Sequence, residues 1–562
     1  MFSRTEPAAG IAAPPVAVAV PAARSSWRPA LWFLVAALGA IAAIQYTNPR
    51  ILGAWHGFVH SAIANRFDVL SFPPENPFFA GEPLPYYWFY QFAGYCVSLA
   101  LGLDLLHTFQ LFSTLSLGVF IVASAAIGRI YSRSKFAGPA IALLALAGIN
   151  PLGPVIAAAK HVLRGVPVVE HRTGPIETVF VTDQTADNLM THPLLPAMYM
   201  GADWRHGQNM VWFFDISSRA PALAMLMVLL YLMADSSGGR RRYTALIMAS
   251  AVLTALSPVI GLSVAAALGV AAVAVVASGE RLNFTPVALT AACVAGAILA
   301  APTYYHMFSG LGGGSGMSLF GKGLAPLSVV AANALLIAPL AVAGARRIGA
   351  MAVIAPAVLF VVVVAVHLPE GNEHNLANAA YCLLAIPAGV ALAAAPRRWA
   401  ALALLAIVPV TAATLFAFAT RPPMPLATSG RLLVRTPAGG DLQRFYEWAR
   451  RATPRDSVFI ADPQSPVKMS GNVSELPAFT GRTLFTDTPN YLTSPNREAA
   501  LRAQWASQIV RGEAPTAGQR DYLARLRRPI YIVNYKPGNE DGMARLYGPP
   551  VFHRGMVSVY AW

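Results

Sequence analysis

The chain has little charge and almost no cysteine. Only 12% of its 562 residues are Asp, Glu, Lys or Arg, whereas soluble domains carry about a quarter. So few charges cannot cover a water-facing surface of this size, which argues against a wholly soluble protein. The three cysteines, Cys96, Cys293 and Cys382, lie far apart in apolar stretches. Neither a disulfide framework nor a cysteine zinc site is therefore expected.

Several local motifs are also missing. The polar tail after Arg421 contains no G-x-G-x-x-G, no Walker loop and no nucleophile elbow. The net charge of +15 comes without a basic stripe interleaved with stacking aromatics, so we expect no nucleic-acid partner. Instead the arginines gather at the ends of apolar segments, as the positive-inside rule predicts for a membrane protein.

Long apolar runs are what the chain does have, and 56% of its residues are hydrophobic. Hydrocarbon offers no hydrogen-bond partner to a peptide group, so apolar runs of about 20 residues must be helices. The runs predict a mainly α, polytopic membrane protein with about eleven transmembrane helices. We place these helices within residues 27–420, after a disordered cytoplasmic N-terminus at residues 1–26.

The arginine clusters orient these spans. Arg240–Arg242, Arg346–Arg347 and Arg397–Arg398 fall on one side of the membrane, which we assign to the cytoplasm. Large outer loops then lie at about 47–106 and about 153–216. The stretch YYWFYQFAGYCVSLALGL could cross the bilayer or lie embedded at its outer surface, and the charge bias favours the surface position. The expected location is the bacterial cytoplasmic membrane.

The tail at residues 421–562 changes character. Short apolar runs such as RPIYIVNY and GMVSVYAW read as strands, and they alternate with helical stretches such as Thr516 to Leu526. That order predicts a small C-terminal α/β domain on the extracytoplasmic, periplasmic side. We favour a structural or substrate-covering role for it.

The first outer loop contains the strongest chemical signal. The string PPENPFFAGEPLPYYWFYQF brings Glu75, Asn76, Glu82, Tyr86 and Tyr87 into a loop with proline-fixed turns. A carboxylate among Pro, Phe and Tyr is costly to bury without a partner. One of them could accept a proton from an incoming hydroxyl or coordinate a metal. Alternatively, Glu75 caps a turn and the aromatics only anchor the interface.

This segment and the span pattern resemble the GT-C superfamily of polytopic glycosyltransferases. The resemblance implies a polyprenyl-phosphate-linked sugar as donor and a catalytic acid in the first outer loop. It also implies an acid one turn before a histidine after the first span. In this chain His56 stands where the acid is expected and His60 matches the histidine. Asp68 and Glu75 are then the candidate bases. The reaction could use a divalent ion such as Mg or Mn, or it could follow an altered or metal-free mechanism.

A lipid phosphate also needs cationic and polar groups near the outer headgroup level. The cluster DWRHGQNMVWFFD, at the end of the second outer loop, fits either a sugar-binding face or an amphipathic helix. No pair of residues there has the spacing of a zinc helix. The candidate binding residues outside the first loop are His206, Asp215, Arg219, Lys322, Glu373 and His374.

The leading hypothesis is a membrane glycosyltransferase that moves a sugar from a polyprenyl phosphate to a glycan, lipid or protein acceptor at the outer face. A lipid or small-molecule transporter or flippase is the first alternative. Transport sites need polar or broken helices near mid-membrane, and these spans are rich in Ala, Val and Leu. A non-catalytic envelope assembly protein descended from such an enzyme is the second alternative.

Overall fold

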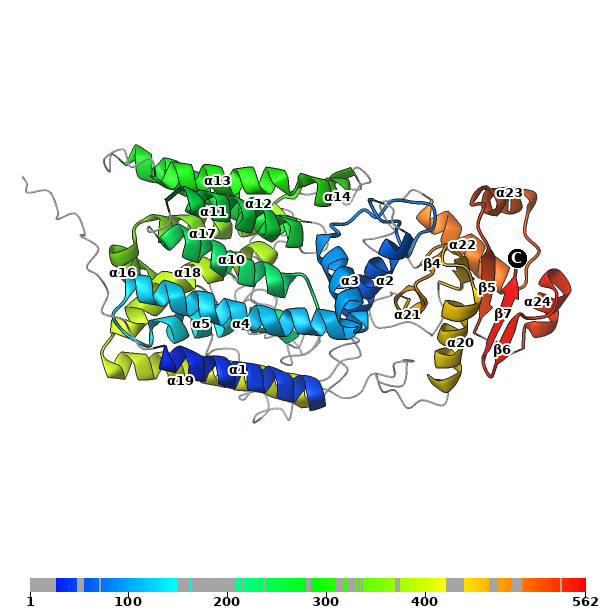
Figure 1. The fold of residues 1–562 in the computed structure, drawn as a ribbon, viewed down its shortest axis with the longest axis horizontal. Coiled ribbons are helices and arrows are strands. Elements are labelled where there is room, and N and C mark those ends of the chain that lie inside the picture. Colours follow the sequence, from blue (N-terminus) through cyan, green and yellow to red (C-terminus); the bar gives the residue numbers. More distant parts are fainter. Residues whose placement is uncertain are drawn as a thin grey trace, which may run out of the picture.

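In the computed structural model the chain forms a helical bundle with a mixed β-sheet at one end (Figure 1). The protein is mostly helical, as predicted. The residues that the structure describes are 27–47, 55–69, 72–148, 162, 209–214, 216–235, 239–278, 285–309, 318–320, 330, 334, 337–368, 374–420, 439–463, 474–487, 498–535 and 538–562.

The bundle helices cover the apolar runs of the sequence. They are α1 (Arg28–Thr47), α4 (Leu105–Tyr131), α5 (Ala137–Ala147), α10 (Arg219–Ala234), α11 (Gly239–Leu256), α12 (Pro258–Ala277), α13 (Thr285–Leu299), α16 (Ala338–Ile348), α17 (Met351–Ala365), α18 (His374–Ala394) and α19 (Arg397–Thr420). Among the described residues, α4, α12 and α18 are long and apolar enough to cross a membrane, and further apolar helices are shorter. The number of spans stays a prediction.

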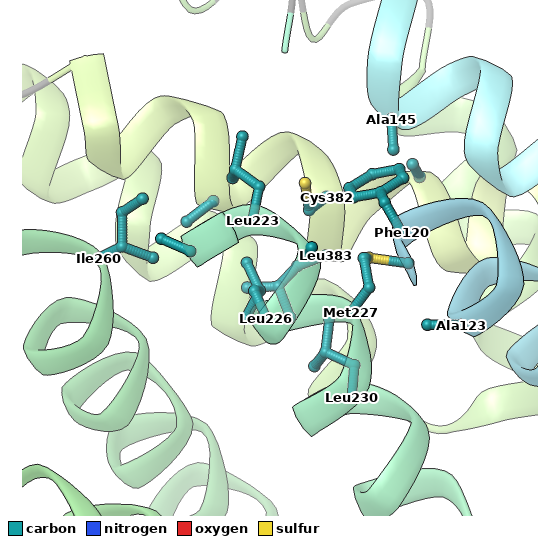
Figure 2. Packing of buried hydrophobic residues seen from close by; sticks show 14 of the residues in the cluster. Phe120, Ala123, Ala145, Leu223, Leu226, Met227, Leu230, Ile260, Cys382 and Leu383 are labelled. Atoms are coloured by element: carbon teal, nitrogen blue, oxygen red, sulfur yellow. The ribbon is translucent and has the colours of Figure 1, made fainter. Parts of the chain in front are cut away.

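Apolar residues at helical spacing build the bundle core. On α10, Leu223, Leu226, Met227 and Leu230 recur at the spacing of one helix face, and all are buried. Figure 2 shows them packed among side chains of α4, α5, α12 and α18, including Phe120 of α4. The long helix α18 lies at the centre of this packing, because most of its residues are buried on every side.

Small residues allow the helices to approach closely. A Cβ built on Gly128 of α4 would collide with the backbone of Gly138 in α5, and one on Gly344 of α16 would collide with the Pro387 carbonyl of α18. Close backbone contact of this kind is how membrane helices associate without a hydrophobic driving force between them.

Short elements cap the end of the bundle that faces the sheet. They are α2 (Trp55–Asn65), the 3₁₀ turn η2 (Arg66–Val69), α3 (Phe89–Leu101), α9 (Met210–Phe214), η5 (Ala301–Thr303) and α14 (Tyr305–Ser309), and a two-stranded ladder of β1 (Ser318–Leu319) with β2 (Val366–His367) lies in the connecting chain. Helix α3, the stretch whose crossing was ambiguous, packs against α2 and α4.

Residues 439–562, here called the C-terminal lobe, contain a five-stranded sheet in the order β4-β3-β5-β7-β6. Strand β3 runs parallel to β4 and β5, whereas β7 runs antiparallel to β5 and β6. The lobe's elements are α20 (Gly439–Ala452), β3 (Val458–Ala461), α21 (Leu476–Thr480), β4 (Thr483–Leu484), α22 (Ala499–Val510), α23 (Ala517–Arg525), β5 (Ile530–Asn534), α24 (Glu540–Tyr547), β6 (Phe552–Arg554) and β7 (Val557–Ala561).

Strand alternation gives this sheet two buried faces. Val458 and Ile460 of β3 point toward α22, α23 and α24, where they form one hydrophobic cluster. Phe459 and Ala461 point to the opposite face, which α20 covers. Residues of the first outer segment, defined here as residues 55–88, complete that second cluster. One hydrophobic cluster thus contains residues from both sides of the predicted domain boundary at 420/421, because the first outer segment packs into the C-terminal lobe.

Candidate functional site

Glu75 lies at the junction of the first outer segment and the C-terminal lobe. Its carboxylate accepts a hydrogen bond from Arg66 at 2.8 Å, from the Gly81 amide at 2.8 Å and from the Thr483 hydroxyl at 3.1 Å. Arg66 and Thr483 bind Oε2 of Glu75, whereas Arg528 of the lobe forms an ion pair with Oε1, which also accepts from Gly81. The side chain is 15% exposed and that of Arg66 only 2%. Both carboxylate oxygens are thus committed to donors.

The electrostatics of Glu75 oppose a role as general base. Burial alone would raise the pKa of its carboxyl, but Arg66, Arg528 and the Gly81 amide outweigh burial and hold the pKa below its ordinary value. A carboxylate that is stabilised as an anion by two guanidinium groups takes up a proton poorly. The geometry favours Glu75 as the residue that joins loop and lobe, and it disfavours the catalytic role expected from the sequence.

The neighbouring predicted residues shape the loop. The buried Asn76 side chain accepts a hydrogen bond from the Phe78 backbone amide at 3.0 Å, and the backbone amide of Asn76 donates to the Glu82 carbonyl at 2.9 Å. These bonds, with the bridge between Glu75 and Pro83, close a tight turn. Asn76 is therefore used as a turn residue here rather than as an open binding group, and Glu82 enters the turn through its backbone carbonyl.

The loop also docks on the sheet. The Ala80 amide donates to the Leu484 carbonyl at 2.9 Å, and the Leu484 amide donates to the Pro77 carbonyl at 2.9 Å. Arg502 of α22 donates to the Ala80 carbonyl at 2.7 Å and stacks over the Phe79 ring at 3.9 Å. The loop thus extends the edge of β4, and its position is set by the lobe.

His60 is a core residue. It is 1% exposed, the Gln91 side-chain amide lies 2.8 Å from its Nδ1, and the rings of Tyr90 and Phe109 pack against it at 4.9 and 6.0 Å. A histidine enclosed in this way between α2, α3 and α4 does not face a substrate. The structure thus disfavours the catalytic role predicted for His60. His56 lies in α2, but its side chain is outside the described part of the chain.

Asp68 differs from Glu75 in its exposure and partners. It lies in η2, and its carboxylate accepts a hydrogen bond from Tyr95 of α3 at 2.6 Å. Arg455 of the C-terminal lobe lies 3.5 Å from the second oxygen of Asp68. The Arg455 side chain is 70% exposed and that of Asp68 is 36% exposed. Asp68 thus presents a partly exposed carboxylate at the same junction, paired with one hydroxyl and one exposed guanidinium.

Tyr86, Tyr87, Arg219 and His374 are linked by a chain of contacts. The Tyr86 hydroxyl donates to the Tyr87 hydroxyl at 2.8 Å, and Tyr87 lies 2.9 Å from the hydroxyl of Ser218, the residue before Arg219. The Arg219 guanidinium lies 3.9 Å from the centre of the Trp212 ring. On Trp212 the His374 ring stacks at 5.5 Å with an angle of 17°. The structure thus brings together four predicted residues through the partners Ser218 and Trp212.

Trp212 corrects the idea of an open sugar face in the DWRHGQNMVWFFD stretch. Trp212, Phe213 and Phe214 are at most 3% exposed, and the indole of Trp212 donates to the Asn378 side chain at 3.2 Å. The side-chain amide of Asn209 reaches the Ala145 carbonyl at 2.8 Å. These aromatics anchor the end of the second outer loop in the bundle, because α9 packs against α4 and α10 and Trp212 bonds to α18.

Some predictions cannot be placed. His206, Asp215, Lys322 and Glu373 lie outside the described residues. Within the described part of the chain, no three His, Cys, Asp or Glu side chains come together so that they could hold a metal ion. The expectation of a divalent ion stays untested.

Sequence reasoning missed the arginines that define this junction. Arg66, Arg455 and Arg528 read locally as ordinary charges on a helix end or a turn, and Arg528 is 453 positions from the carboxylate that it binds. A weak signal did exist. An acidic residue in an apolar, proline-rich loop requires a cationic partner, and the arginine-rich tail supplies several.

Comparison with solved structures identifies the fold. The crystal structure of ArnT from Cupriavidus metallidurans bound to undecaprenyl phosphate matches with a TM-score of 0.53 at 13% identity, over 95% of this chain and 98% of that chain. The apo form of ArnT gives 0.51. The cryo-EM structure of arabinofuranosyltransferase AftD from Mycobacteria gives 0.52 at 15% identity, over 95% of this chain and 40% of that chain.

These structures have the GT-C fold, and so does this chain. The resemblance seen in the first outer loop is thus confirmed at the level of the fold. It extends over nearly the whole length of ArnT. No family model and no curated protein matches the sequence.

Proposed function

We propose that this protein is a membrane glycosyltransferase that moves a sugar from a polyprenyl-phosphate donor to an acceptor at the outer face of the bacterial cytoplasmic membrane. The observation that carries the proposal is the full-length match to a structure with bound undecaprenyl phosphate. Fold alone does not specify chemistry. The proposal therefore also rests on the groups gathered where the bundle meets the C-terminal lobe.

Asp68 is the base in this proposal. Glu75 is held as an anion by Arg66 and Arg528, and His60 is enclosed in the core. Asp68 combines a carboxylate with exposure to solvent. It takes the proton of the acceptor hydroxyl, whose oxygen then attacks the anomeric carbon of the sugar while the bond to the lipid phosphate breaks. A single displacement of this kind inverts the anomeric configuration.

Arg219 is the group assigned to the leaving phosphate, and the buried His374 ring stacks on the Trp212 ring beside it. Arg219 is the first residue of α10, where the partial positive charge of the helix dipole already favours an anion. Its stacking on Trp212 fixes the plane of the guanidinium, and a fixed guanidinium binds phosphate oxygens in pairs. Tyr87 and Ser218 connect this position to the first outer segment.

The orientation follows from the arginine clusters. Arg346 and Arg347 end α16, and Arg397 begins α19. Helix α16 lies at the end of the bundle away from the C-terminal lobe (Figure 1). With arginines in the cytoplasm, the lobe and the first outer segment share the periplasmic side.

The test is transfer from radiolabelled polyprenyl-phosphate sugars to envelope lipids, glycans and proteins by the full chain in nanodiscs. We expect transfer by the wild type and a fall of at least 100-fold in Asp68→Asn, since general base catalysis contributes about 10² to 10⁴. The matched control is Asp521→Asn, which removes an exposed carboxylate of α23. Transfer measured with and without a metal chelator tests whether the reaction requires a divalent ion.

The outcomes separate the alternatives. Equal transfer by the wild type and Asp68→Asn would remove Asp68 as the base. Uptake of labelled lipid or sugar into proteoliposomes without any transfer would identify a transporter or flippase. If neither transfer nor uptake occurs, the chain is a non-catalytic envelope protein.

A further inference from the structure

Arginines crowd the turn that lies next to Asp68. Helix α20 ends at Ala452, and the chain then turns through Arg455 into β3. Three arginine side chains are exposed here: Arg450 and Arg451 at the end of α20, and Arg455 in the turn that follows. Arg455 points to Asp68, with 3.5 Å between its Nη1 and the carboxylate. The C-terminal lobe therefore contributes a cation directly to the proposed base.

Two buried arginines hold this turn from the inside. Arg482 donates to the carbonyls of Arg450 and Thr453 at 2.9 and 2.8 Å, and to the Thr453 hydroxyl at 3.1 Å. Arg66 reaches the Arg455 carbonyl at 3.5 Å. The backbone that presents Arg450 and Arg455 is thus fixed before any ligand arrives, which lowers the entropy lost on binding.

Cations outnumber carboxylates at this position. Glu75 is already shared between Arg66 and Arg528. In the described part of the chain, Arg482 has hydrogen bonds only to neutral oxygens. Burial first, and then repulsion by Arg455, Arg66 and Arg450, lowers the pKa of the Arg482 guanidinium. An added anion would relieve this repulsion.

We propose that Arg455 and Arg450 form an anion-binding site for the acceptor, which therefore carries a phosphate group near the hydroxyl that receives the sugar. This inference rests on the proposed function, with Asp68 as the base. A phosphate oxygen that binds Arg455 draws the guanidinium away from Asp68 and leaves the carboxylate oxygen open to the acceptor hydroxyl. The lobe then selects the acceptor as well as covering the site.

The surroundings suit two sources of phosphate. Val69, next to Asp68, and Leu99, one helical turn from Tyr95 on α3, are exposed apolar side chains. They would suit the chain of an anionic lipid whose headgroup reaches Arg455. A soluble phosphate monoester would use the arginines alone. The shared chemistry is a phosphate oxyanion, and the experiment distinguishes the two sources.

The experiment measures binding by the full chain without any sugar donor. One arm titrates glycerol 3-phosphate against the protein in phosphatidylcholine nanodiscs, and the other compares phosphatidylglycerol with phosphatidylcholine nanodiscs. Both use calorimetry or the shift of the unfolding temperature. We expect binding in at least one arm, weakened about tenfold in Arg455→Gln and partly restored in Arg455→Lys, because each charge-assisted bond is worth about a decade in affinity.

Arg511→Gln is the matched control, because Arg511 forms an equally exposed pair with Glu513 at 3.1 Å elsewhere on the lobe. Wild-type protein that binds neither probe, or an equal loss in both variants, would overturn the anion site. Failure of the transferase is a separate result. If anion binding depends on Arg455 but no sugar is ever transferred, the site stands and the proposed function falls.

Discussion

Glu75→Gln tests whether one carboxylate fastens the C-terminal lobe to the first outer segment. Glutamine keeps the size of the side chain and one acceptor oxygen but removes the charge that neutralises Arg66, a guanidinium that is 2% exposed. Breaking a buried ion pair from one side costs about 3 to 5 kcal/mol. Because the amide oxygen keeps part of the hydrogen bonding, we take the lower end, about 3 kcal/mol.

Hydrogen exchange at two backbone amides measures this loss directly. The amides of Ala80 and Leu484 bond across the junction, the first to the Leu484 carbonyl and the second to the Pro77 carbonyl, each at 2.9 Å. If undocking exposes them, a loss of about 3 kcal/mol speeds their exchange roughly 100-fold, since 1.36 kcal/mol is a factor of ten. Amides in the bundle core should not change.

The pH dependence provides a second readout with a defined sign. The pKa of Glu75 is lower in the folded protein than its ordinary value of 4.5. Its stabilising contribution is therefore complete above that ordinary value and is lost as pH falls toward the folded pKa. The difference between wild type and Glu75→Gln should be constant near neutral pH and shrink in acid.

The control is Asp68→Asn, which breaks the exposed pair with Arg455. Exposed pairs contribute about 0 to 1 kcal/mol, so the exchange of Ala80 and Leu484 should stay within a few-fold of wild type. Unchanged exchange in Glu75→Gln, or equal acceleration in both variants, would refute the argument that Glu75 joins loop and lobe.

Two further predictions concern the lobe and the bundle. Burial raises the pKa of Glu475 to about 8, although the Tyr446 hydroxyl that donates to it at 2.6 Å lowers it somewhat. The native state therefore holds this proton between pH 4.5 and about 8, so the free energy of unfolding should fall as pH rises through that window. In denaturant unfolding, the free energy of unfolding of Glu475→Gln should not fall with pH in this way. The same dependence of unfolding free energy on pH in wild type and variant would contradict the prediction. Arg219→Gln should raise the KM for a polyprenyl-phosphate sugar about tenfold in steady-state transfer assays, because a charge-assisted bond to the phosphate is lost. An unchanged KM would remove Arg219 from the donor site.

The sequence predicted the parts of the fold that depend on local pattern. Apolar runs alone indicated the bundle helices. The short apolar runs RPIYIVNY and GMVSVYAW contain β5 and β7, and the helix expected from Thr516 to Leu526 is α23 with a capping box at its start. These features succeed because hydropathy and caps act over one or two turns of chain.

The site was predicted only in outline. The sequence singled out Tyr86, Tyr87, Arg219 and His374 as binding residues, and the structure links them through Ser218 and Trp212, but their binding role stays a prediction. The role of each carboxylate could not be predicted. Glu75 and Asp68 look alike in the sequence, but Glu75 is largely buried between two arginines, whereas Asp68 is more exposed and pairs with one exposed arginine.

The sequence by itself determined a mainly helical, apolar chain and the short-range elements of its tail. Only the tertiary structure decided that the first outer segment completes the core of the C-terminal lobe and that Glu75 meets Arg528. The physical reason is distance along the chain. A carboxylate's charge state and accessibility depend on the groups that surround it in space, and here those groups come from residues hundreds of positions away.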